Sequence, residues 1–148
     1  MNATDRVQKE LRGQVVLTQV SPIGERCMVK KNLVVDGAYM QLAYLLGYTT
    51  LAYINKVRYG SSGAAPTTAD TNVTPIAGVG FLSTVNTFPT STSVKFTAPW
   101  ASAIVCATPV EEAGLFSSNG IMIARVVFAP MTKSAGWTWL LEWQLSYI

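Results

Sequence analysis

The residues of this sequence best suited to chemistry are two adjacent carboxylates, Glu111 and Glu112, and a lone arginine, Arg125, in an apolar run. Glycoside hydrolysis uses two carboxyl groups that face each other across the substrate. Adjacent residues on a strand point to opposite faces, so Glu111 and Glu112 cannot form such a pair. A charged side chain in an apolar strand needs an opposite charge. We therefore predict that Arg125 forms an ion pair with Glu111 or Glu112, across two strands or between subunits, and we prefer this role to catalysis or anion binding.

The sequence contains few residues suited to other kinds of catalysis or to metal binding. The sequence has no histidine, which excludes Ser-His-Asp and Cys-His catalysis and zinc sites that need histidine. Its eight Asp and Glu residues are dispersed and lack the spacing of a calcium loop. The sequence GSSG at residues 60–63 lacks the Gly-Lys-Ser/Thr ending of a phosphate-binding loop. We expect no enzymatic activity, no catalytic residue, no metal and no cofactor.

The composition bounds the class of protein. A chain of 148 residues is about one domain long, and 49% of them are hydrophobic while only 13% are charged. So few charges suggest that other chains cover part of the surface, and an apolar-rich monomer is the alternative. The net charge of +3 is scattered, which gives nucleic-acid binding little support. The sequence has neither an apolar run long enough to span a membrane nor a signal sequence, so we expect synthesis in the cytoplasm and no membrane partner.

The patterns along the chain predict a β-rich domain behind an N-terminal arm. Residues 1–13 are polar and are expected to be the arm, either as a short helix or as a flexible segment that orders on a neighbour; residues 14–148 form the single domain. Within it, residues 14–35 resemble a hairpin, residues 37–46 a helix, and residues 51–60 a strand. Cys27 and Cys106 lie far apart, so buried free thiols are expected and a disulfide stays open.

A loop of about a dozen residues follows the strand at residues 51–60. Loops of this length are uncommon in compact domains unless they bind something. We therefore predict an interaction loop whose candidate residues are Gly60, Ser61, Ser62, Gly63, Pro66 and Asp70.

The segment EEAGLFSSNGIMIARVVF at residues 111–128 is predicted to be a hairpin whose turn takes its positive φ angles from Asn119 and Gly120. Its second arm is apolar on both sides, with Ile121, Ile123 and Val127 on one side and residues 122, 124, 126 and 128 on the other. Both sides therefore need cover.

The last segment alternates most clearly. One side of residues 137–148 carries Trp137, Trp139, Leu141, Trp143, Leu145 and Tyr147, as in a long half-buried strand. Together these patterns favour a mainly β fold, an antiparallel β-sandwich of two sheets with one short α-helix. An α+β arrangement, an antiparallel sheet flanked by the helix, is the alternative.

The order of four segments resembles a known family. These are KNLVVDGAYMQLAYLLG, YGSSGAAPTTADT, EEAGLFSSNGIMIARVVFAPMTK and the final alternating strand, and the resemblance covers about residues 28–148. They are similar to small structural proteins of tailed bacteriophages, which recur as tail-fibre, baseplate or head-decorating components. The resemblance implies a β-sandwich-like virion subunit without catalytic residues, present as a symmetric oligomer.

The function expected from residues and resemblance together is that of a non-enzymatic virion protein. It would be a homo-oligomer, with a trimer as one symmetry, in the tail, baseplate or neck, assembled in the host cytoplasm and docked on other virion proteins through the arm and loops. The alternatives are a capsid decoration protein and a receptor- or carbohydrate-binding module. That module would use the loop at residues 60–72 and some of Tyr53, Tyr59 and Trp100, and a host receptor would then be a partner.

Overall fold

The computed structural model describes residues 11–47 and 53–148. In these residues nine strands form one sheet in the order β4-β3-β7-β8-β2-β1-β9-β6-β5, and every neighbouring pair is antiparallel. The elements are β1 (Leu11–Ser21), β2 (Gly24–Val34), α1 (Asp36–Gly47), β3 (Ile54–Gly60), β4 (Leu82–Ser83), β5 (Val85–Thr90), β6 (Ser93–Trp100), β7 (Cys106–Ser117), β8 (Met122–Lys133) and β9 (Thr138–Tyr147). The prediction of a mainly β fold with one short helix is confirmed.

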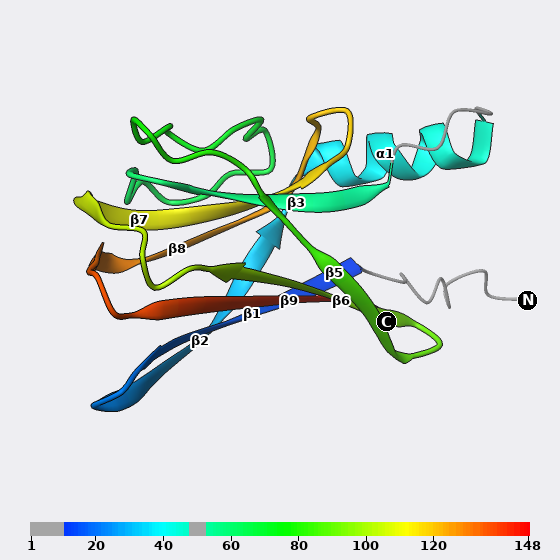
Figure 1. Ribbon diagram of the computed structural model, residues 1–148. Coiled ribbons are helices and arrows are strands. Elements are labelled where there is room, and N and C mark those ends of the chain that lie inside the picture. The colour runs from blue at the N-terminus through cyan, green and yellow to red at the C-terminus, as the bar shows by residue number, and fades with distance from the viewer. Residues whose placement is uncertain (1–10, 48–52) are drawn as a thin grey trace, which may run out of the picture.

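The two layers of Figure 1 are the two halves of this sheet. Strand β2 belongs to both, because residues 24–32 pair with β1 whereas Leu33 and Val34 pair with Arg125 and Ala124 of β8. The strands at the two ends of the order, β4 and β5, are separated in the chain only by Thr84, whose amide donates to the carbonyl of Asn55 in β3. The sheet therefore nearly closes on itself.

The core lies between the two layers and is built around aromatic rings. Tyr59 of β3 stacks on Trp100 of β6 with ring centroids 4.6 Å apart, and both rings meet the edge of Trp139 on β9. Trp143, four residues further along β9, is also fully buried, as the alternation of this segment predicts. The side of β9 that carries Trp139 and Trp143 thus packs the lower layer against the upper one.

The predicted local elements are found with small shifts. The hairpin at residues 14–35 is β1 and β2, and the helix at residues 37–46 is α1. Strand β1 begins at Leu11, inside the segment predicted to be the arm, and residues 1–10 of that segment lie outside the described residues. Both cysteines are free, but only Cys106 is buried. The prediction of burial is wrong for Cys27, because the part of β2 that carries it is paired on one side only, with β1.

The hairpin of β7 and β8 turns differently from the prediction. The Ser117 amide donates to the Ile121 carbonyl at 2.9 Å, and the Gly120 amide donates to the Ser117 carbonyl at 3.0 Å. Gly120 has φ +87°, while no described residue other than glycine has a positive φ, so the positive φ predicted for Asn119 is wrong. The connection is a three-residue loop, which needs a left-handed residue only at its last position.

The two sides of β8 also differ from the predicted alternation. The register shifts between Leu115, which pairs with Ala124, and Phe116, which pairs with Met122, so Ile123 is an extra residue. Ile123 and Ala124 consequently both face the core, together with Val126 and Phe128. Met122 lies on the outer side in a second small cluster with Val35, Val73 and Phe116.

Candidate functional site

The candidate site is the outer side of β7 and β8, with the loop that covers it. We call it the loop-covered face and define it by Glu112, Gly114, Phe116, Met122 and Arg125. The loop between β3 and β4 lies over the upper layer in Figure 1, and its Val73 packs on Phe116 and Met122. This side of the hairpin was predicted to need cover, and the chain's own loop supplies it.

Arg125 is the centre of a charged network on the loop-covered face. It pairs with Gly114, which has no side chain, and its guanidinium reaches diagonally to Glu112, whose partner across the strands is Val127. Arg125 Nε donates to Glu112 Oε2 at 2.6 Å, and the Glu112 side chain is completely buried. The carboxylate predicted to pair with Arg125 is therefore Glu112, while Glu111 lies beside Gly63 of the loop.

The second carboxylate of the network comes from the loop. Arg125 Nη1 donates to Asp70 Oδ2 at 2.7 Å, and the Asp70 carboxylate also accepts hydrogen bonds from the backbone amide and hydroxyl of Thr67. Burial alone would raise the pKa of Asp70, but the hydrogen bonds from Thr67 and Arg125 outweigh it and lower the pKa. Burial alone would likewise lower the pKa of Arg125, and the hydrogen bonds to Asp70 and Glu112 raise it. The network thus favours the charged forms of Asp70 and Arg125.

Glu112 also fixes both ends of the first part of the loop, residues 61–74. Its Oε1 accepts hydrogen bonds from the backbone amides of Ser62 at 3.1 Å and Thr74 at 2.6 Å, and the Ser61 amide donates to the Thr74 carbonyl at 3.1 Å. These contacts need Gly60, because a Cβ there would lie 2.4 Å from Glu112 Oε1 and 2.7 Å from the Thr74 carbonyl oxygen. The three hydrogen bonds that the Glu112 carboxylate accepts compensate for its loss of water. Its role here is to hold the loop in place.

The candidate residues of the predicted interaction loop fall into two groups. Gly60, Ser61, Ser62 and Asp70 belong to the fixed ends. Gly63 and the residues from 64 to 69 form the outer part, in which Gly63 is exposed and Pro66 is half-buried. The part of this loop available to a partner is thus its tip, between two ends that the buried network holds.

The aromatic rings considered for sugar stacking are mostly unavailable. Tyr59 and Trp100 are buried against each other in the core, so the alternative of a carbohydrate-binding module cannot use these two rings. The reason is the alternation of β3, which turns Val57 and Tyr59 inward. Tyr53, just before that strand, is 60% exposed.

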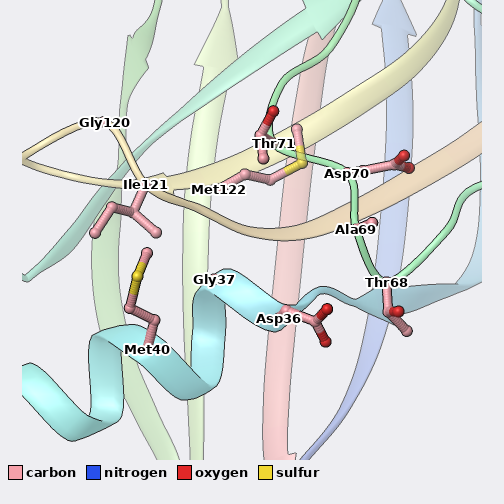
Figure 2. A pocket seen from close by; sticks show the side chains of 10 residues that line it. All are labelled: Asp36, Gly37, Met40, Thr68, Ala69, Asp70, Thr71, Gly120, Ile121 and Met122. Atoms are coloured by element: carbon pink, nitrogen blue, oxygen red, sulfur yellow. The ribbon is translucent and has the colours of Figure 1, made fainter.

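A cavity of about 570 Å³ lies beside the loop-covered face, between the start of α1, the loop and the turn of the hairpin (Figure 2). Met40 and Ile121 point toward each other across it, and Asp36 and Thr68 lie at its other end. The Asp36 amide donates to the Thr68 carbonyl at 2.8 Å, which ties the start of the helix to the loop. Apart from Asp36 and Asp70, the lining has no charged side chain.

Sequence reasoning missed a second buried charge, Lys133 at the end of β8. Its ammonium is fully buried and donates to the backbone carbonyls of Ala101, Ile104 and Trp137. Burial lowers the pKa of Lys133, and the three carbonyls act in the opposite direction because they bind the charged form. Nothing in its flanking sequence distinguishes this lysine from a solvated one, because its acceptors are backbone groups.

The described residues include no group of three or more metal-binding side chains, and no described helix is long and apolar enough to cross a membrane. Comparisons of the chain with protein-family models, with curated proteins and with solved structures found no match.

Proposed function

We propose that this chain is a non-enzymatic structural protein of a tailed-bacteriophage virion, a homo-oligomeric component of the tail, baseplate or neck. The proposal starts from the order of the four sequence segments that resemble that family. It is supported by what their distinctive residues do. Among their charged residues, Asp70, Glu112 and Lys133 bind backbone groups of the protein itself.

The observation that carries the proposal is the meeting of the first three of these segments at the loop-covered face. Leu33 and Val34, from the first segment, pair with β8, and the next residue, Val35, donates its amide to the Ile123 carbonyl at 3.0 Å. Asp70, from the second segment, binds Arg125, and Arg125 binds Glu112 within the third. Segments that recur together in order are expected to form one packing unit, and the first three do, while the fourth, β9, pairs with β1 and β6 in the other layer.

This unit favours a structural role over a catalytic one. Glu112 and Arg125 satisfy each other and the loop, and a substrate would have to break these contacts to reach either group. A rigid β-domain with its loop tied down is suited to repeated assembly, where each copy must present the same surface.

The experiment is to locate the protein in particles produced from the genome that encodes it. Purified particles are expected to contain the chain in a fixed copy number by quantitative mass spectrometry. Gold-labelled antibody against the folded protein is expected to mark the tail end of the particle. Its absence from purified particles would overturn the proposal, and label on the head would replace it with the capsid decoration protein.

A further inference from the structure

An apolar groove lies between α1 and the hairpin of β5 and β6. Its volume is about 350 Å³. Leu42 and Leu45 of the helix form one wall, Phe88 of β5 lies on another, and Tyr147 near the end of β9 completes the rim. None of the residues that line the groove is charged. It is open to solvent in the described chain, unlike the loop-covered face.

The helix beside this groove has an inverted polarity for a surface helix. It buries Ala38 and Gln41 and exposes most of its large apolar side chains. Leu46 is 90% exposed, and Leu42 and Leu45 are each about two fifths exposed. A surface helix of a monomer normally turns its apolar stripe to the core and its polar side to water. The exposed side of α1 is therefore suited to contact with another apolar surface.

The exposed residues around the groove make a patch that approaches the size of one side of a standard interface. We call Leu42, Leu45, Leu46, Phe88 and Tyr147 the apolar end; Phe88 is 78% exposed and Tyr147 is 48% exposed. At roughly 200 Å² for a large apolar side chain, their exposed fractions amount to about 600 Å². This is at the upper limit of the largest patch on a typical monomer, and one partner of a standard interface buries roughly 800 Å².

We propose that the apolar end binds a second copy of this chain. The inference rests on the homo-oligomer of the proposed function and adds the surface through which it forms. Two features favour a second copy as the occupant. The patch has no charge, so two copies meet without repulsion, and it carries both a projecting ring, Phe88, and a groove of matching polarity beside it.

The open edge of β2 is a less suitable surface for self-association. Residues 24–32 of this strand have no partner on the side away from β1 among the described residues. The edge carries Arg26, Lys30 and Lys31, and lysines on an edge strand discourage pairing with other strands. An interface at the apolar end and an interface at the edge of β2 would therefore respond in opposite ways to the same substitutions.

The test compares substitutions at two side chains that are equally exposed. Leu46 of the apolar end and Ile23 in the turn between β1 and β2 are both 90% exposed. The full-length wild-type chain at micromolar concentration is expected to show a mass that is a multiple of 16.0 kDa in light scattering. Leu46→Glu and Phe88→Glu are each expected to raise the dissociation constant about 100-fold, while Ile23→Glu leaves it unchanged. Near-ultraviolet circular dichroism of each variant checks that the fold is retained.

Several results would overturn the inference. The first is a monomeric wild type, which would mean that no second copy covers the apolar end. The second is an oligomer that persists in both Leu46→Glu and Phe88→Glu while each variant retains the fold. If Ile23→Glu dissociates the oligomer and the other two do not, the edge of β2 is the interface and the inference is wrong. Each of these results leaves detection of the protein in virions unaffected. Conversely, an oligomer that depends on the apolar end in a protein absent from virions would overturn the proposed function alone.

Discussion

The loop-covered face and the apolar end are two surfaces of the same β-domain, and they differ in whether the chain itself buries them. At the loop-covered face the chain lays its own loop over β7 and β8 and fixes it with Glu112, Arg125 and Asp70. At the apolar end it leaves Leu46 and Phe88 in water. One surface is closed within the chain, and the other is open to solvent in the described residues.

The difference follows from the physical nature of the two contacts. A buried ion pair depends on the exact positions of its atoms, and removing one partner leaves an uncompensated charge. Such a contact is best made between segments that the same fold holds together. Apolar contact is not directional, and removing apolar surface from water is favourable, so it suits an association between separate copies.

Breaking the network at the loop-covered face is expected to have the largest effect. Arg125→Met leaves the carboxylate of Glu112 buried with only two backbone amide donors. The free energy of unfolding is expected to fall by about 3 to 5 kcal/mol in urea titration. The matched control is Lys95→Met, which breaks a more exposed ion pair with Glu142 across β6 and β9 and is expected to cost about 1 kcal/mol or less. Equal losses of unfolding free energy in the two variants would show that the buried network stabilises the fold no more than an exposed ion pair does.

Filling the space beside Glu112 is expected to have the next largest effect. Gly60→Ala places a methyl group against the Thr74 carbonyl and the Glu112 carboxylate and is expected to lower the free energy of unfolding by about 1 to 3 kcal/mol. Gly63→Ala is the matched control in the same loop, because its methyl group would meet only the end of the Glu111 side chain. Urea titration of both variants checks this, and a Gly63→Ala variant as unstable as Gly60→Ala would contradict the role given to Glu112.

The sequence predicts more of the fold than of the site. The alternation of β9, the hairpin of β1 and β2, and the helix are local patterns of hydrophobicity and appear where they were expected. The register shift that moves Ile123 into the core is not local, because it depends on how β7 and β8 meet. A strict alternation could not reveal that extra residue.

The candidate site was predictable only in part. The need of Arg125 for a carboxylate follows from its apolar neighbours, and the hairpin brings Glu112 within reach. Asp70 lies 55 residues away from Arg125 in sequence and was assigned to an interaction loop, because nothing in the sequence shows where that loop folds back. Lys133 was missed for a similar reason, since its partners are carbonyl groups of distant segments.

Raising the protein concentration is expected to stabilise the wild type through the apolar end. If a second copy binds there, each tenfold increase adds about 1.4 kcal/mol per association step to the free energy of unfolding. Leu46→Glu is expected to remove this dependence, while Arg125→Met lowers stability and keeps the dependence. Urea midpoints measured across a hundredfold range of concentration check the prediction. A wild-type midpoint independent of concentration would contradict it.

The smallest expected effect concerns the outer member of the network, Asp70. Because its pKa in the folded state is lowered, the carboxylate stabilises the fold above the ordinary carboxyl pKa of about 4, and this contribution disappears as the pH falls through the lower folded-state value. Asp70→Asn is therefore expected to lower the free energy of unfolding by about 1 kcal/mol at pH 7 and to match the wild type at strongly acidic pH. Asp36→Asn, at the other end of the cavity in Figure 2, is the control outside the network. Urea titrations at several pH values check the prediction, and a difference between Asp70→Asn and wild type that persists in acid would mean that Asp70 acts through its shape and not through its charge.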